Sequence, residues 1–138
     1  MAAKDSIHDA VKNALVKDGW QITDDPFTIQ YKKVSLLIDL AAERTFAAER
    51  NGVKIAVEVK SFLNPSLLND LKEAVGQYEI YLSYLEIIEP DRKLYVAINQ
   101  KAYKALTSLE GLEVVLQKHR IPLIVVNVET LEIVQWIS

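Results

Sequence analysis

A carboxylate and an amine lie two residues apart in the β-branched segment Ile55-Ala56-Val57-Glu58-Val59-Lys60-Ser61-Phe62. The alternation of a strand puts Glu58 and Lys60 on one face. Val57 and Val59 then form the other, apolar face. Charged groups on a central strand are costly unless they have partners. Glu58 and Lys60 are therefore the first candidates for chemistry.

A second acid, Asp39, interrupts an apolar run from Leu36 to Leu40 that reads as a strand. A charge inside an apolar strand again needs a partner or a function to account for it. An acid-x-lysine pattern is weak by itself, because Asp70-Leu71-Lys72 and Asp91-Arg92-Lys93 repeat it. The first of these repeats falls in an expected helix and the second in a turn, so neither presents both side chains on a sheet face.

The elements that must position these residues follow from the hydrophobic spacing. A helix is expected from near Asp5 or Ser6 to Gly19, because its apolar residues recur every three or four positions. Strand texture begins near Thr28 and includes Val34–Leu40 and Val53–Phe62. The pair Asn51-Gly52 predicts a two-residue hairpin turn.

The second half of the chain alternates helices and strands. Asn64-Pro65-Ser66 opens a long helix that Pro90 ends, with Leu68, Leu71, Val75, Tyr78, Leu82 and Leu85 on its apolar face. Further elements are a strand over 93–98, helices over 100–109 and 112–119, and strands over 121–128 and 131–137. This order predicts an α/β fold, with a mixed sheet flanked by helices and a C-terminal β-hairpin. We expect residues 1–138 to form one domain.

Composition excludes several kinds of site. The chain has no cysteine and two histidines, which rules out disulfides, thiolate metal sites, cysteine nucleophiles and histidine-rich metal centres. It contains no glycine-rich phosphate loop and no G-x-S-x-G motif. No signal peptide or membrane span is expected, so the predicted location is cytoplasmic.

The overall charge argues against a general affinity for nucleic acid, since the formal net charge is −3. Six of the 16 Lys and Arg residues fall between residues 32 and 60, around the candidate site. They are Lys32, Lys33, Arg44, Arg50, Lys54 and Lys60. We therefore expect any DNA-binding surface to lie there and its affinity to fall with added salt.

The combination of strand Asp39, strand Glu58-x-Lys60 and a following long helix resembles the PD-(D/E)xK nuclease superfamily. The core of that restriction-endonuclease-like fold runs α-β-β-β-α-β. At family level, the segments HDAVKNALVKDGWQIT, IDLAAE, IAVEVKSF, GQY and IVQWI resemble the XisH family of fdxN element excision controlling factors. In filamentous cyanobacteria that family is linked to programmed excision of a DNA element, together with a small companion, XisI.

The resemblance implies a role for each matching residue. Asp39 and Glu58 would bind the metal with the backbone carbonyl of Val59, and the metal would be Mg²⁺ or Mn²⁺. Lys60 would orient or activate the attacking water. Gln77, in Gly76-Gln77-Tyr78, would lie beside the site. The expected partners are DNA and an XisI-like companion. Association of the chain with itself as a homo-oligomer is left open.

Other interpretations of these residues remain open. Glu58 and Lys60 could form a structural ion pair, Asp39 could cap a loop or pair with Lys60, and Gln77 could be a solvated helix residue. A strict hairpin at Asn51-Gly52 puts position 64, not Glu58, opposite Asp39, so a bulge or strand break is needed before Ala47. Glu43 or Glu49 could otherwise supply the second carboxylate, and His8, on the flank of the first helix, could join the site. The function could also be non-catalytic: a regulatory or assembly module acting through XisI.

Overall fold

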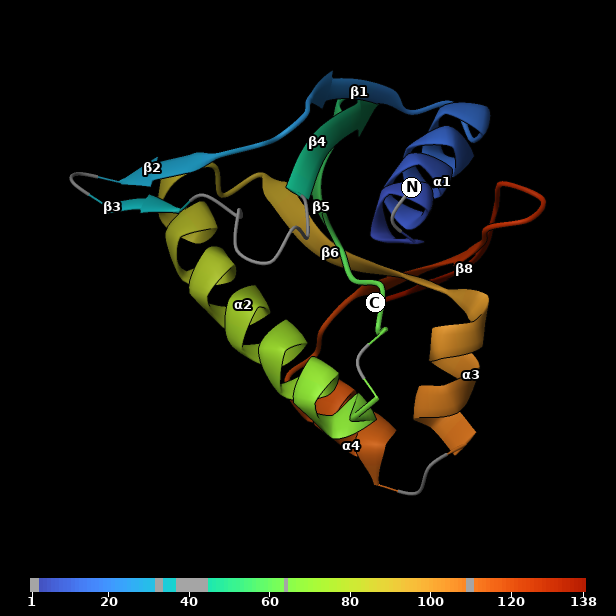
Figure 1. The fold of residues 1–138 in the computed structure, drawn as a ribbon. Helices are drawn as coiled ribbons and strands as arrows, with labels where there is room; N and C mark the ends of the chain where they lie inside the picture. The colour runs from blue at the N-terminus through green and yellow to red at the C-terminus, as the bar shows by residue number, and fades with distance from the viewer. Residues whose placement is uncertain (1–2, 32–33, 37–44, 64, 109–110) are drawn as a thin grey trace.

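A computed structural model describes residues 3–31, 34–36, 45–63, 65–108 and 111–138 (Figure 1). The elements in chain order are α1 (Ala3–Lys17), β1 (Gln21–Asp24), β2 (Ile29–Tyr31), β3 (Val34–Leu36), β4 (Thr45–Arg50), β5 (Val53–Val59), α2 (Leu67–Ile88), β6 (Arg92–Asn99), α3 (Gln100–Ser108), α4 (Leu112–Lys118), β7 (Leu123–Asn127) and β8 (Glu132–Ile137). None of the helices in these ranges is long and apolar enough to cross a membrane.

Six strands form one mixed sheet in the order β1-β4-β5-β6-β7-β8. The β5–β6 and β6–β7 pairs are parallel, and the other three pairs are antiparallel. Helix α1 covers one face, while α2, α3 and α4 cover the other (Figure 1). The prediction of a mixed α/β fold with helices on the sheet and a C-terminal hairpin, β7–β8, is confirmed.

The apolar residues of β5 divide between two cores. Ala56 packs in the core beneath α2, α3 and α4, whereas Ile55, Val57 and Val59 pack in the core beneath α1. Since successive side chains of a strand alternate, Glu58 shares the face of Ala56. The sequence pattern had predicted this division.

The hairpin between β4 and β5 is the predicted two-residue turn. Asn51 and Gly52 have φ of 52° and 82°, the left-handed values that a type I′ turn requires. The register is regular from Arg50 opposite Val53 to Thr45 opposite Glu58. Glu58 therefore lies opposite the first residue of β4, at the end of the sheet away from the turn.

Helix α2 has the boundaries that the sequence predicts. The Ser66 side chain accepts a hydrogen bond from the backbone N–H of Asn69 at 3.2 Å, and Pro90 follows the C-cap Glu89. Leu71, Tyr78 and Leu85 are buried as expected. Leu68, in the first turn, was expected on the apolar face but is 54% exposed.

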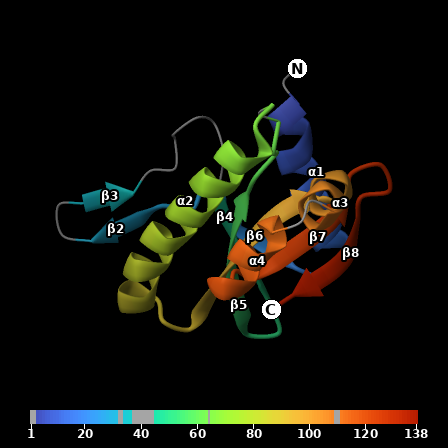
Figure 2. The same ribbon diagram turned by 90° about the horizontal axis from the view of Figure 1, so that it is seen from below.

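Two strand predictions need correction. Strand texture was expected only from near Thr28, but Gln21–Asp24 already form the edge strand β1, whose mostly exposed side chains show no apolar alternation. The predicted strand Val34–Leu40 is seen as β3 only for Val34–Leu36. β3 pairs with β2 in a separate two-stranded sheet beside the C-terminal part of α2, outside the main sheet (Figure 2). Residues 37–40 of that prediction lie outside the described part of the chain.

Candidate functional site

Glu58 and Lys60 stand at the C-terminal end of β5, on the sheet face that α2 covers. The Glu58 residue is 0% exposed and Lys60 is 4% exposed. The Lys60 Nζ lies 3.8 Å from the Glu58 Oε2. The predicted acid and amine are thus neighbours inside the protein rather than groups on its surface.

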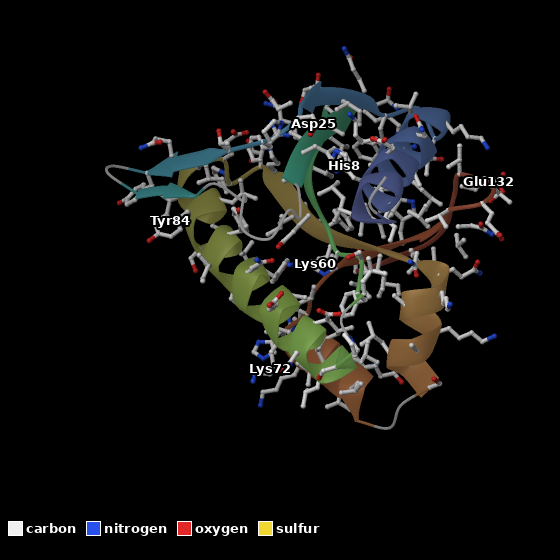
Figure 3. The ribbon with its side chains drawn as sticks, in the orientation of Figure 1. His8, Asp25, Lys60, Lys72, Tyr84 and Glu132 are labelled. Carbon is white, nitrogen blue, oxygen red and sulfur yellow. The ribbon has the colours of Figure 1, made fainter. Side chains whose placement is uncertain are left out.

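Helix α2 brings the third predicted residue to the same place. The Lys60 Nζ donates a hydrogen bond to the Oε1 of Gln77, which lies in the third turn of α2. Figure 3 shows Lys60 extending from the end of β5 toward α2. Glu58, Lys60 and Gln77 are therefore brought together, and we call them the β5–α2 cluster.

The backbone orients the Val59 carbonyl. The N–H of Lys60 donates to the Ala97 carbonyl of β6 at 2.9 Å. In a trans peptide the C=O points opposite to the following N–H, so the Val59 carbonyl points away from β6, toward the β4 side of the sheet. The first described residue on that side is Thr45.

The other predicted acids do not complete the cluster within the described residues. Asp39 and Glu43 lie outside those residues. Glu49 lies opposite Lys54, near the hairpin turn. It is four strand positions from the Glu58 level, which is about 13 Å. The interpretation in which Glu49 shares a cation with Glu58 is therefore wrong.

The donor set can be judged against the needs of a hard cation. Mg²⁺ and Mn²⁺ bind carboxylate and carbonyl oxygens, and the cluster offers the Glu58 carboxylate and the Val59 carbonyl. Over the described ranges, no group of three His, Asp or Glu side chains could hold an ion. These two oxygens fit such an ion only if Asp39, outside the described residues, adds the second carboxylate.

His8 belongs to a different cluster on the opposite face of the sheet. Its Nε2 lies 3.2 Å from the Oδ2 of Asp25, and the Lys12 Nζ donates to the same oxygen at 2.5 Å. Figure 3 shows His8 and Asp25 beside α1, away from Lys60. His8 is 4% exposed and its ring meets Phe46 edge-on at 5.6 Å. His8 does not join the β5–α2 cluster.

The charges around Asp25 set its protonation. Burial alone would raise the pKa of the Asp25 carboxyl, but the hydrogen bonds from Lys12 and His8 and their positive charge outweigh it and hold the pKa below 3.8. Sequence reasoning missed this role of Asp25, because nothing in a turn aspartate indicates a partner 17 residues earlier. We call His8, Lys12 and Asp25 the α1 cluster.

The predicted basic surface is only partly visible. Lys32, Lys33 and Arg44 lie outside the described residues. Lys54 is exposed near the hairpin, and Arg50 turns toward Trp20 on the α1 face. Lys60 is buried, so it adds no exposed positive charge to the surface around the site.

Together these features define a class: an α/β protein with a mixed six-stranded sheet and a buried carboxylate–lysine–glutamine cluster between sheet and helix. Residues 1–134 match the XisH family. The chain belongs to the XisH family, as its sequence resemblance indicated.

Two crystal structures are similar to this chain along nearly its whole length. An XisH family protein from Nostoc punctiforme PCC 73102 has 40% sequence identity and a TM-score of 0.88, with 97% of this chain and 100% of that one covered. An fdxN element excision controlling factor protein from Anabaena variabilis has 43% identity and a TM-score of 0.88, covering 97% and 99%. A search of curated proteins gave no match.

Proposed function

We propose that this protein controls excision of a DNA element and does so through metal-dependent hydrolysis of a DNA phosphodiester. Family membership and the name of the Anabaena variabilis relative support the excision role. The hydrolytic step is carried by one observation: Glu58 and Lys60 share a sheet face and Gln77 accepts a hydrogen bond from the lysine.

Each residue of the proposed site would have its own role in hydrolysis. Glu58, the Val59 carbonyl and Asp39 would hold Mg²⁺ or Mn²⁺, and the ion when bound would polarise the phosphodiester and acidify water. Lys60 would orient the attacking water and steady negative charge on the phosphate. Gln77 would hold the Lys60 ammonium in place through its hydrogen bond.

The proposal includes membership of the restriction-endonuclease-like superfamily. Its support is the chain order, in which a helix and several strands precede Glu58 and Lys60 at the end of β5, and α2 and β6 follow. The parallel β5–β6 pair places the long helix on the same face as the cluster.

DNA is the proposed substrate and an XisI-like protein the proposed companion. The net charge of −3 opposes DNA binding by the chain alone. A bound metal ion and a companion protein would both reduce the electrostatic repulsion between the chain and DNA. Binding should therefore be measured at low salt with and without the companion.

A non-catalytic role is the second candidate, and burial favours it. Glu58 has no exposed surface and Lys60 is only 4% exposed. A buried carboxylate beside a buried lysine is also the arrangement of a structural ion pair. In this case the protein would act as a regulatory or assembly module through the XisI-like companion.

Cleavage by matched variants separates the two candidates. The wild type, Glu58→Gln and Lys60→Met would be incubated with Mg²⁺ or Mn²⁺ and duplex, branched or single-stranded DNA, with and without the companion. We expect each variant to lose roughly 10²–10⁴-fold in rate at a temperature where circular dichroism shows that the destabilised variant is still folded. Lys104→Met, which removes an exposed lysine of α3, should cleave like the wild type.

If the wild type cleaves none of these DNAs under any of these conditions, hydrolysis is excluded and the non-catalytic module stands. Cleavage that survives in Glu58→Gln and Lys60→Met would place the active site elsewhere.

A further inference from the structure

Three aromatic side chains from distant parts of the chain meet on the α1 face of the sheet. Trp20 follows α1, Tyr95 lies in β6 and Trp136 lies in β8. The Trp20 and Trp136 rings are 5.8 Å apart, and the Tyr95 and Trp136 rings meet edge-on at 5.1 Å. Trp20 is buried, whereas Tyr95 and Trp136 are partly exposed. The group therefore offers aromatic surface to a ligand.

Two cations stand over these rings. The Arg50 guanidinium lies 4.6 Å from the centre of a Trp20 ring, and the Lys93 Nζ lies 5.1 Å from the Tyr95 ring centre. Arg50 also donates to the carboxylate of Asp18 at 2.9 Å, which offsets part of its charge. Lys93 is exposed, and its Nζ donates a hydrogen bond to the Ser138 hydroxyl at 3.2 Å. Its positive charge is thus available to an anion.

These groups line a cavity of about 320 Å³ that is open to solvent. Its lining comprises Trp20, Arg50, Val53, Ile55, Lys93, Tyr95 and Trp136. That volume lies at the lower end of the range for small-molecule sites. Aromatic walls with cations at the rim match a flat ring that carries an anionic group.

Trp20 contributes its ring, and not its polar atom, to this site. The Trp20 indole N–H is buried and has no hydrogen-bond acceptor among the residues that the structure describes. A buried donor normally has a partner, because leaving it unpaired costs free energy. Since solvent does not reach this nitrogen, a ligand in the cavity would meet the Trp20 ring rather than its N–H.

We propose that this cavity binds a nucleotide. The base would lie against Tyr95 and Trp136, and the phosphate would lie between Lys93 and Arg50. Stacking on aromatic side chains and charge pairing with the backbone are the common means of binding unpaired nucleotides. The nucleotide could be free or part of a single strand, since both carry the same base and phosphate.

The cavity is separate from the β5–α2 cluster. It lies at the start of β5, near Val53 and Ile55, whereas Glu58 and Lys60 lie at the end of that strand. Ile55 also packs in the core beneath α1, while the cluster faces α2. Nucleotide binding here does not depend on the proposed hydrolysis.

The chain provides its own probe, because Trp20 and Trp136 are its two tryptophans. Tryptophan emission would be titrated with dAMP, a single-stranded oligo(dA), adenosine and inorganic phosphate, in the presence of a metal chelator. Excitation at the red edge of tryptophan absorption avoids adenine. We expect saturable quenching by dAMP, by oligo(dA) or by both, weaker quenching by adenosine, and none by phosphate.

Variants locate the binding. Trp136→Ala should weaken binding roughly tenfold, followed through Trp20 emission. Lys93→Ala should weaken it roughly fivefold and reduce its dependence on salt. Lys104→Ala removes an exposed lysine far from the cavity and should bind like the wild type. Because Lys93 is exposed, its variant should fold even if Trp136→Ala does not.

Each result decides the proposal. Quenching by dAMP alone identifies a free nucleotide, and quenching by oligo(dA) identifies a single strand. Absence of saturable quenching by both would overturn the proposal. Equal affinity in Lys93→Ala and the wild type, or quenching by phosphate alone, would overturn it too. No cleavage is measured, so this proposal and the proposed hydrolysis fail independently.

Discussion

Two ionic clusters lie on opposite faces of the same sheet, and they differ in depth. In the β5–α2 cluster, the Glu58 and Lys60 side chains are 0% and 5% exposed. In the α1 cluster, Asp25 and Lys12 are 16% and 29% exposed. The deep pair is held by a central strand, whereas the shallow one joins a helix to the turn before β2.

The difference in depth gives the two clusters different energetics. Water screens the α1 cluster, so its ion pairs contribute modestly to stability. The β5–α2 cluster has lost the solvation of two charges, and removing one partner leaves the other buried. A site of that kind is costly to keep, which fits a role beyond stability.

The largest expected effect tests this contrast at Lys60. Lys60→Met should lower the free energy of unfolding by about 3–5 kcal/mol, because Glu58 would stay buried without the neighbouring ammonium. Denaturant unfolding measures it. The double variant Glu58→Gln/Lys60→Met should lose less than Lys60→Met alone. If Lys60→Met loses no more unfolding free energy than Asp25→Asn, the two clusters do not differ in energy as their burial predicts.

A smaller loss is expected in the α1 cluster. Asp25→Asn should cost about 1–2 kcal/mol of unfolding free energy, because hydrogen bonds to Lys12 and His8 are weakened in partly exposed surroundings. The same unfolding assay applies. Asp9→Asn, at an exposed position of α1, should stay within about 0.5 kcal/mol of the wild type.

Acid should remove the contribution of Asp25. Its pKa is below 3.8 in the folded protein, so the folded state binds fewer protons than the unfolded state as the pH falls through that region. The stabilisation is present above pH 3.8 and is lost as the pH drops through the folded pKa. The stability difference between the wild type and Asp25→Asn should therefore shrink on acidification. A difference that stays constant would contradict this account of the cluster.

A separate effect is expected in alkali, on the α2 face. Burial, with the charges of Glu79 and Glu86, raises the pKa of Tyr78 from 10.0 to about 12. Between these values the folded state holds a proton that the unfolded state has released, so stability falls as the pH rises. The wild type should lose more stability in this range than Tyr78→Phe. If the wild type and Tyr78→Phe lose equal stability between these pH values, burial does not raise the pKa of Tyr78.

Much of the fold was predictable because it depends on local patterns. The apolar stripe of α1, the capped ends of α2 and the Asn51-Gly52 hairpin all appear as expected. Strand β1 was missed because an exposed edge strand lacks apolar alternation. β3 was assigned to the main sheet because periodicity identifies a strand but not its neighbours.

The candidate site was predictable in part for the same reason. Strand alternation placed Glu58 and Lys60 together, since they are two residues apart on β5. The contact between Lys60 and Gln77 needed the resemblance or the structure, because 17 residues separate them. The pairing of Asp39 with Glu58 is still a prediction, since Asp39 lies outside the described residues.

The sequence by itself determined which short segments become helices and strands and which residues of β5 share a face, because these depend on neighbours along the chain. Only the tertiary structure decided that Lys60 is buried, that His8 meets Asp25, and that Trp20, Tyr95 and Trp136 surround one cavity. Burial and contacts of this kind depend on how distant elements pack. No spacing within a single element records that packing.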